Sequence, residues 1–273
     1  MADAGARAAL AAAAARFSFS PTARLDAELL LAHALGIPRE RLLLTLGDHE
    51  VPAGFAALVA RRAAHEPVAY ITGTRAFWTI DLDVAPGVLI PRADSETLIE
   101  AAVAHFAGTA GPRNVLDLGT GSGALLLAAL DQWPQATGVG IDASPAALAI
   151  AARNAARIAP GRAQVIAGDW TGTGASFDLV LCNPPYIATG EVLPDEVARY
   201  EPASALYAGD DGLDDYRRLA PLIGAQIAPG GIACIEIGAT QAGTAGALFR
   251  AAGLHVTVHR DLAGRDRCLA VTS

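Results

Sequence analysis

From Asn114 onward, short apolar runs alternate with longer segments of helical periodicity, and this alternation restricts the fold more than any other feature of the sequence. Such runs have the length of buried strands, and helices between successive strands permit parallel pairing. We therefore predict an α/β fold with a mainly parallel sheet of seven strands. The predicted strands are Val115–Leu118, Thr137–Ile141, Ala163–Ile166, Asp178–Cys182, Ile232–Ile237, Leu254–His259 and Arg267–Val271. The predicted helices between them are Ser122–Leu130, Pro145–Arg157, Leu213–Gln226 and Gln241–Ala252.

The first part of the chain, residues 8–73, has helical patterns without strands. A broad apolar stripe over Leu25–Leu35 and further helical starts at Arg39 and Phe55 predict a small helical bundle. The alanine-rich segment Ala8–Ala15 can also be read as a signal peptide, but it lacks a convincing apolar centre. Alanine is the best helix former, so we predict a first helix here.

A β-hairpin is predicted between these two regions, with Phe77–Val84 and Val88–Ile90 as its strands. Asp94 is then predicted to cap a helix that runs to about Phe106. The expected division of the chain is a helical N-terminal domain over residues 1–75, a hairpin linker over 76–91 and the α/β domain over 92–273.

Composition narrows the class of protein. The chain carries 28 acidic and 20 basic residues, a net charge of −8, and every basic residue is arginine. An acidic body argues against binding to a nucleic-acid backbone, which needs clustered cations. The three cysteines, Cys182, Cys234 and Cys268, have no metal-type spacing, so we expect buried free thiols, no metal and a reducing, cytoplasmic environment. No run of 18 strongly apolar residues predicts a membrane span.

A glycine-rich loop, Gly119-Thr120-Gly121-Ser122-Gly123, connects a predicted strand to a predicted helix. Glycines there let the backbone turn tightly and approach a ligand, with helix N–H groups facing it. Asp142 follows Gly123 by 19 residues, at the end of the next strand, where a carboxylate can accept both ribose hydroxyls. The loop by itself fits both a nicotinamide cofactor and S-adenosylmethionine.

Two further features favour S-adenosylmethionine. Asp117, two residues before the loop, can hold the loop or meet a cationic group, whereas a pyrophosphate would be repelled there. After the third strand, Asp169 and Trp170 offer a carboxylate and an aromatic face to an adenine. The alternative for this pair is an ordinary loop.

The tetrapeptide Asn183-Pro184-Pro185-Tyr186 follows a buried strand directly. The prolines end the strand and hold Asn183 extended at its carboxyl end, which is the edge where α/β sheets bind ligands. Read alone, the tetrapeptide is equally consistent with a stiff turn.

Together these segments resemble the class I S-adenosylmethionine-dependent methyltransferases, and the tetrapeptide resembles the signature of those that methylate planar nitrogens. Within that group the chain is similar to the family of protein-(glutamine N5) methyltransferases that modify peptide chain release factors. The resemblance covers nearly the whole chain. It extends through Leu25–His33, Pro67–Gly73, Phe77-Trp78, Leu89–Arg92 with Asp94 and Glu96, Tyr200–Pro202 and Asp211–Leu213.

The resemblance implies a Rossmann-like methyltransferase domain, S-adenosylmethionine as methyl donor, and a glutamine in a Gly-Gly-Gln loop of a release factor as acceptor. The N-terminal helices are implied to help grip that partner, and we expect a monomer that binds neither nucleic acid nor membrane. The implied catalytic and substrate-binding residues are Asn183, Pro184, Pro185 and Tyr186. The expected cofactor-binding residues are Asp117, Gly119, Thr120, Gly121, Ser122, Gly123, Asp142, Asp169, Trp170 and Asn183.

Three alternatives stay open at this point. A sister enzyme that methylates a ribosomal-protein glutamine would share the core, and an adenine-N6 nucleic-acid methyltransferase would share the tetrapeptide, although it would want basic patches. A binding protein that has lost the activity is the third. Arg92 and Glu96 are equally consistent with a surface ion pair, and Glu201 with a loop residue.

Overall fold

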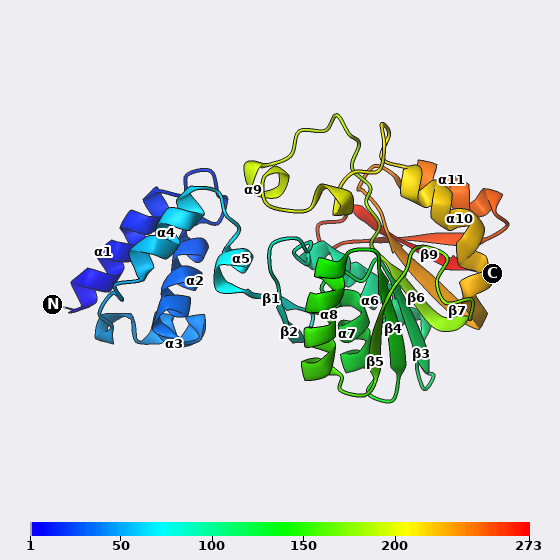
Figure 1. Ribbon diagram of the computed structural model, residues 1–273, viewed down its shortest axis with the longest axis horizontal. Helices are drawn as coiled ribbons and strands as arrows, with labels where there is room; N and C mark the ends of the chain where they lie inside the picture. The colour runs from blue at the N-terminus through cyan, green and yellow to red at the C-terminus, as the bar shows by residue number, and fades with distance from the viewer. Residues whose placement is uncertain (1) are drawn as a thin grey trace. The chain divides into compact units, whose positions relative to one another are not determined.

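The computed structural model of the chain describes residues 2–273, and they form two compact units. Unit 1 contains the chain up to Thr74 together with Pro194–Tyr200, and unit 2 contains Arg75–Leu193 and Glu201–Ser273. The expected boundaries place 194–200 in the α/β domain, so the compact units differ from them at this segment. Figure 1 shows both units coloured along the chain.

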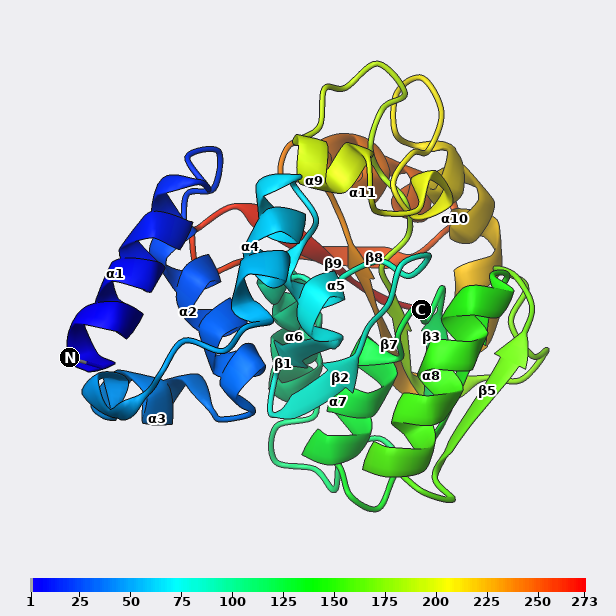
Figure 2. The ribbon, with the colours of Figure 1, turned by 60° about the vertical axis from the view of Figure 1, so that its left-hand side comes forward.

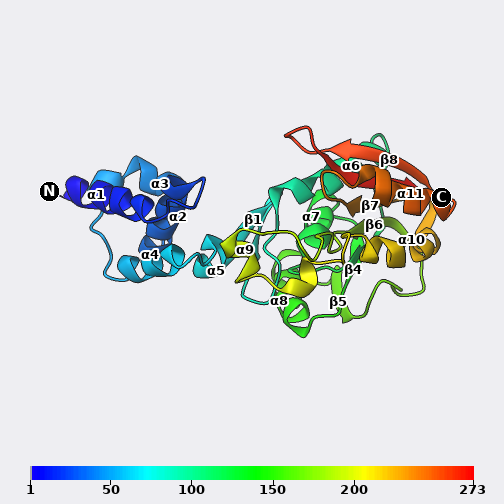
Figure 3. The same ribbon diagram turned by 90° about the horizontal axis from the view of Figure 1, so that it is seen from above.

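Unit 1 is a helical bundle, as predicted (Figure 3). Its apolar core joins Leu10, Leu31 and Leu42 from the first three helices with Phe17, which follows the first helix, and none of these side chains has exposed surface. The alanine-rich start is helical, in agreement with the prediction of a first helix. The helices are α1 (Ala2–Ala15), α2 (Ala23–Leu35), α3 (Arg39–Leu44), the 3₁₀ turn η1 (Leu46–Asp48), α4 (Phe55–Ala63), α5 (Val68–Thr72) and α9 (Asp195–Ala198).

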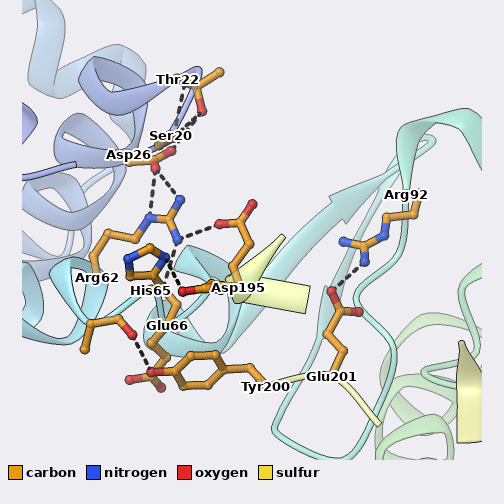
Figure 4. Close-up of polar contacts among 12 residues, drawn as sticks. Ser20, Thr22, Asp26, Arg62, His65, Glu66, Arg92, Asp195, Tyr200 and Glu201 are labelled. Atoms are coloured by element: carbon orange, nitrogen blue, oxygen red, sulfur yellow. Dashed lines mark hydrogen bonds and ion pairs between the residues drawn. The ribbon is translucent and has the colours of Figure 1, made fainter. Parts of the chain in front are cut away.

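Helix α9 joins unit 1 through the buried guanidinium of Arg62 (Figure 4). Arg62 Nε donates to Asp26 Oδ2 at 2.9 Å, and its Nη1 donates to Glu196 Oε2 at 2.7 Å. Just beyond α9, Tyr200 Oη donates to the carbonyl oxygen of Ala64 at 2.8 Å. A buried cation needs such partners, and Arg62 thereby fixes a segment that is more than 130 residues away in sequence.

Unit 2 is built on a seven-stranded sheet in the order β5-β4-β3-β6-β7-β9-β8. The first five strands of this order pair in parallel, and only the two ladders of β9, with β7 and with β8, are antiparallel. The predicted mainly parallel, seven-stranded α/β sheet is therefore confirmed. Its strands are β3 (Asn114–Leu118), β4 (Thr137–Asp142), β5 (Ala163–Ala167), β6 (Phe177–Cys182), β7 (Ile227–Glu236), β8 (His255–Arg260) and β9 (Asp266–Thr272).

Helices cover both faces of this sheet, and each face has its own apolar core (Figure 2). One core contains Leu98, Leu126 and Ala155 from three successive helices, and the other contains Tyr216 and Phe249. The first face carries α6 (Glu96–His105), α7 (Ala124–Gln132) and α8 (Pro145–Ile158), and the second carries α10 (Asp214–Gln226) and α11 (Ala242–Ala251). The short 3₁₀ turns η2 (Ala93–Ser95) and η3 (Ala203–Ala205) precede α6 and follow α9.

The predicted hairpin linker is wrong in both strands: the turn falls inside the predicted first strand, Phe77–Val84, and Val88–Ile90 forms no strand. The two-stranded sheet consists of β1 (Thr74–Phe77) and β2 (Ile80–Asp83), with Trp78 and Thr79 between them. Val88 packs beside α8 instead of entering a ladder, and the Ile90 N–H donates to the Glu201 carboxylate at 3.1 Å. Burial, not strand pairing, explains the apolar character of this stretch.

The predicted cap at Asp94 is also wrong. No side-chain cap bond is present at the start of η2 or α6. The Asp94 carboxylate instead pairs with Arg265 at 2.9 Å and with Arg267 at 3.3 Å, both far away in sequence. Ion pairing with two guanidinium groups therefore takes the carboxylate away from the helix terminus.

Candidate active site

The glycine loop and the Asn-Pro-Pro-Tyr tetrapeptide leave adjacent strands at the same edge of the sheet. Leu118, the last residue of β3, pairs with Cys182, the last residue of β6, so Gly119 and Asn183 are the next residues on neighbouring strands. The chain runs outward from β3 to β4 and β5 and then returns to β6 on the other side of β3. Such a reversal of strand order leaves a crevice at the carboxyl ends of the two strands.

A cavity of about 380 Å³ occupies this place, and its lining residues all belong to unit 2. Its size suits a small molecule. Ten of the predicted site residues line it: Asp117, Gly119, Thr120, Gly121, Ser122, Asp142, Asp169, Trp170, Asn183 and Pro185. The other three, Gly123, Pro184 and Tyr186, are not among its lining residues.

Asp117 is hydrogen-bonded to the glycine loop and to the helix that follows it. Its Oδ2 accepts hydrogen bonds from Thr120 Oγ1 at 2.6 Å and from the Leu126 N–H at 3.2 Å. Its Oδ1 is buried and has no hydrogen-bond partner among the described residues. Burial raises the pKa of Asp117 to about 7 despite these donors. The free oxygen is therefore suited to a cationic ligand group, which would restore the ionised form.

Asp142 presents a preoriented carboxylate at the end of β4. Its Oδ2 accepts from the Gly121 N–H at 2.8 Å, and its Oδ1 accepts from the Ser144 N–H at 2.8 Å. A carboxylate has about four acceptor positions, so capacity remains for two more donors. Vicinal hydroxyl groups of a ribose match that capacity.

Trp170 lies against the glycine loop. A Cβ atom at Gly119, where φ is +70°, would come within 3.1 Å of the indole ring. The indole Nε1 donates to Asp215 Oδ1 at 3.0 Å, and the Trp170 carbonyl oxygen accepts from Gln226 Nε2 at 3.0 Å. These bonds hold the ring at the cavity wall, where it can contact a planar ligand.

Asp169 keeps its charge at the cavity's exposed edge. Hydrogen bonds from the side chain and the backbone N–H of Thr171 lower the pKa of its carboxyl group. A carboxylate fixed in this way can accept a hydrogen bond from a ligand amino group.

The amide of Asn183 has a defined direction. Its Nδ2 donates to the Ser95 hydroxyl oxygen at 3.2 Å. Both side chains line the cavity. With the nitrogen end engaged by Ser95, the carbonyl oxygen Oδ1 is the end available to accept a hydrogen bond.

Tyr186 faces the protein interior. Its hydroxyl donates to Glu236 Oε1 at 3.2 Å, and its carbonyl oxygen accepts from Gln241 Nε2 at 3.0 Å. Burial, followed by the Glu236 charge, raises the pKa of the Tyr186 hydroxyl far above its usual range. The phenol is therefore neutral at any ordinary pH and serves as a hydrogen-bond donor.

Arg92 and Glu96 do not form the surface pair that the sequence allowed. Arg92 Nη2 pairs with Glu201 Oε1 at 2.5 Å, while Glu96 Oε1 accepts from the Trp78 N–H at 2.8 Å. The Glu201 side chain is 1% exposed, and Figure 4 shows its pair with Arg92. Glu201 is thus a buried anchor beside Pro202, which lines the cavity.

Sequence reasoning missed several cavity residues. Ser95 and Asp215 lie in or beside predicted helices, and nothing in their local pattern marks them as facing a ligand. Glu236, which contacts Tyr186 but does not line the cavity, had a usable signal, because it is an acid at the end of a mostly apolar strand.

The three cysteines are buried and free, as predicted. Within residues 2–273, no group of three or more His, Cys, Asp or Glu side chains is arranged to hold a metal ion. In the same part of the chain, none of the helices combines the length and the apolar character that crossing a membrane requires.

Comparison with protein families gives two matches in this chain. Residues 8–73 match the PrmC N-terminal domain, and residues 94–200 match the methyltransferase small domain. The first match falls in the helical bundle, and the second begins in η2 and includes the glycine loop and the tetrapeptide.

Two curated relatives cover most of the chain. The release factor glutamine methyltransferase of Rhodospirillum rubrum is 43% identical over 90% of this chain and 78% of its own length. The protein of the same name from Cereibacter sphaeroides is 45% identical over 90% of this chain and 89% of its own length.

Solved structures share the fold at low identity. The hMettl16 catalytic domain in complex with the MAT2A 3′UTR hairpin 6 has a TM-score of 0.56 at 16% identity, covering 78% of this chain and 80% of that one. A methyltransferase from Pyrococcus furiosus has a TM-score of 0.54 at 16% identity, covering 78% of this chain and 95% of that one. At this identity the likeness concerns the fold alone.

Proposed function

The chain belongs to the release factor glutamine methyltransferase family, and on that premise we propose that it methylates the side-chain amide nitrogen (N5) of the glutamine in the Gly-Gly-Gln motif of peptide chain release factors. It is an S-adenosylmethionine-dependent methyltransferase. The observation that carries the proposal is the 43–45% identity to curated enzymes over 90% of the chain. The family match over residues 8–73 adds the helical bundle to this likeness, and the match over 94–200 adds the glycine loop and the tetrapeptide.

The cavity residues fit S-adenosylmethionine, and we assign them by their chemistry. Asp117 would meet the ammonium group, Asp142 the ribose hydroxyls, and Asp169 with Trp170 the adenine. The glycine loop from Gly119 to Gly123 would let the ligand approach the backbone. When bound, S-adenosylmethionine supplies a methyl carbon on a positively charged sulfur, and this carbon–sulfur bond breaks with its electron pair left on sulfur as the amide nitrogen bonds to the carbon.

The acceptor side is assigned to the tetrapeptide. An amide nitrogen is a poor nucleophile because its lone pair is delocalised into the carbonyl group. Asn183 Oδ1 and the Pro184 carbonyl oxygen would each accept an N–H of the substrate amide, which orients the nitrogen and stabilises the positive charge that it develops. Pro185 and Tyr186 would shape the pocket for the planar amide. The nitrogen's extra proton then leaves to water, without a strong general base.

The two parts of the chain would divide the work. We assign recognition of the release factor to residues 1–75, a linker role to 76–91 and methyl transfer to 92–273. The enzyme would act as a monomer in the cytoplasm, where release factors are found, and it would not bind nucleic acid directly. The net charge of −8 supports the last point.

The proposal is tested by incubating the protein with methyl-labelled S-adenosylmethionine and a purified release factor. We expect one methyl group on the glutamine of the Gly-Gly-Gln motif, located by peptide mass spectrometry, and none on a release factor with that glutamine changed to alanine. Ribosomal proteins and nucleic acid serve as competing substrates in parallel reactions. Label on either of these, with none on the release factor, would contradict the proposal.

The role of Asn183 is tested by Asn183→Ala. We expect methyl transfer to fall at least 100-fold, because the amide loses its acceptor, while calorimetry finds the affinity for S-adenosylmethionine within about threefold of wild type. Asn114→Ala, at the opposite end of the sheet, is the matched control and should retain activity. Equal turnover in wild type and Asn183→Ala would remove Asn183 from the reaction.

A further inference from the structure

A chain of polar side chains connects Asn183 to a buried carboxylate. Asn183 Nδ2 donates to Ser95 Oγ at 3.2 Å, and the Ser95 hydroxyl lowers the pKa of the Glu236 carboxyl group. Tyr186, at the other end of the tetrapeptide, donates to Glu236 Oε1 at 3.2 Å. Glu236 is the last residue of β7, adjacent to β6, so its carboxylate contacts one end of the tetrapeptide directly and is linked to the other end only through Ser95.

Burying these polar groups costs free energy, because each of them loses its contacts with water. Ser95 is 3% exposed and Glu236 is 1% exposed. Glu236 Oε2 has no donor at hydrogen-bond geometry among the described residues, so the carboxylate still has acceptor capacity for the Ser95 hydroxyl. An apolar pair of the same size would avoid the desolvation of a carboxylate. A role in directing Asn183 offers a reason to retain the polar pair.

The direction of the hydrogen bonds follows from what each group can do. An ionised carboxylate only accepts hydrogen bonds, so we assign the single hydrogen of Ser95 Oγ to Glu236. The Ser95 oxygen is then limited to accepting, and the side of Asn183 that meets it must be the N–H₂ end. This leaves Asn183 Oδ1 on the other side, where it can accept an N–H from the substrate.

We propose that Ser95 and Glu236 are positioning residues that fix the Asn183 amide with its oxygen toward the acceptor nitrogen. The inference rests on the proposed function, because it assigns a purpose to the Asn183 amide in that reaction. Without Ser95 the amide can turn by 180° and present its own N–H₂ group to the substrate amide. Two donors then face each other, and the nitrogen loses its orientation.

The same logic gives the reaction a dependence on pH. A protonated Glu236 can donate to Ser95, whose hydrogen then points to Asn183 and favours the reversed amide. Burial raises the pKa of Glu236 to about 6, with Ser95 and Arg267 opposing that rise. The other titratable or charged groups around this carboxylate are Asp94, Cys182, Tyr186, Tyr216 and Cys268. We therefore expect kcat to fall as the pH decreases through about 6.

The first test uses Ser95→Ala and Ser95→Thr with a release factor as substrate. Ser95→Ala should lower kcat at least tenfold and leave the KM for S-adenosylmethionine within about twofold, whereas Ser95→Thr, which keeps a hydroxyl, should recover most of the rate. Ser176→Ala, at an exposed position of unit 2, is the matched control. In an Asn183→Ala background, Ser95→Ala should cause no further loss, because the residue that it positions is already gone.

The second test is the pH profile of kcat between pH 5 and 8. Wild type should show a one-proton loss of rate near pH 6, and Glu236→Gln should lack this inflection, since an amide does not titrate in that range. Glu100→Gln, on the exposed side of α6, should keep it. Melting temperatures of all variants separate loss of fold from loss of orientation.

The outcomes separate this inference from the proposed function. If wild type does not methylate the release factor, the proposed function fails. If wild type is active but Ser95→Ala equals it in kcat, or loses rate equally with and without Asn183, the positioning role is wrong. An inflection near pH 6 that persists in Glu236→Gln overturns the part assigned to Glu236.

Discussion

The pH dependence of cofactor binding is the sharpest test of the site, because we expect it to depend on the ionisation of a single carboxyl group, that of Asp117. Asp117 Oδ1 is buried without a partner among the described residues, and burial raises the pKa of this carboxyl group to about 7. If the ammonium group of S-adenosylmethionine binds here, it binds the ionised form. The Asp117 carboxyl group must therefore lose its proton before S-adenosylmethionine binds tightly.

The magnitude follows from this pKa. The ionised fraction of a group with a pKa of about 7 falls about tenfold between pH 8 and pH 6, so the affinity should weaken about tenfold, or about 1.4 kcal/mol, on that account. Asp117→Asn keeps the shape but removes the charge. A hydrogen bond to a charged group contributes about 1.5–3 kcal/mol, so this variant should bind about 10- to 100-fold more weakly at pH 8.

Isothermal titration calorimetry at pH 6, 7 and 8 measures the effect. Methylthioadenosine, which lacks the amino-acid part of the cofactor, is the matched control ligand and should bind Asp117→Asn and wild type equally at each pH. The ammonium group of the cofactor also changes its protonation with pH, but it does so equally with wild type and with Asp117→Asn. The ratio of the two proteins' affinities at each pH therefore reports the effect of Asp117 alone. A ratio that does not change with pH, or an equal loss for methylthioadenosine, would refute the reasoning.

The protein without cofactor should show the opposite trend in stability. The folded-state pKa of Asp117 lies above its ordinary value, so the native state holds the proton more tightly than the unfolded state. The contribution of Asp117 to the free energy of unfolding therefore decreases as the pH rises from about 4 to about 7. Asp117→Asn should remove this decrease in denaturant titrations.

Two further predictions concern backbone and charge. Gly119→Ala places a methyl group within 3.1 Å of the Trp170 ring at a φ of +70°, so the affinity for the cofactor should fall at least tenfold. The control is Gly174→Ala, where φ is +78° and no atom lies within 4 Å of the added methyl group. It carries the same backbone cost of about 1–2 kcal/mol and should leave the affinity measured by calorimetry unchanged. Arg62→Ala leaves buried carboxylate uncompensated and should cost about 3–5 kcal/mol in the denaturant transition of unit 1, whereas Arg61→Ala, at a side chain that is 44% exposed, should cost less than about 1 kcal/mol. Equal losses in either pair of variants would contradict the corresponding argument.

The sequence predicted those parts of the protein that depend on short-range patterns. Runs of apolar residues predict the strands of the sheet and the helices that cover it. The glycines that begin at Gly119 predict the loop that lines the cavity. Asp142 and Asn183 were located because Asp142 ends one strand and Asn183 directly follows another, and parallel strands bring their carboxyl ends to one edge. The predictions failed where burial had another cause. Val88–Ile90 is apolar because it is buried, with Val88 packed against α8, and not because it pairs with another strand. Asp94 does not cap a helix because its carboxylate forms ion pairs with two arginines that are distant in sequence.

What the sequence determined by itself is the class of fold and the places of the glycine loop and the tetrapeptide at the ends of strands, because these depend on neighbours in the chain. Only the tertiary structure decided that Asn183 meets Ser95, that Tyr186 turns to Glu236, and that α9 belongs with the helical bundle through Arg62. Each of these contacts joins residues that are 50 or more positions apart. Their partners are selected by the packing of whole elements, and no local pattern of the sequence encodes that packing.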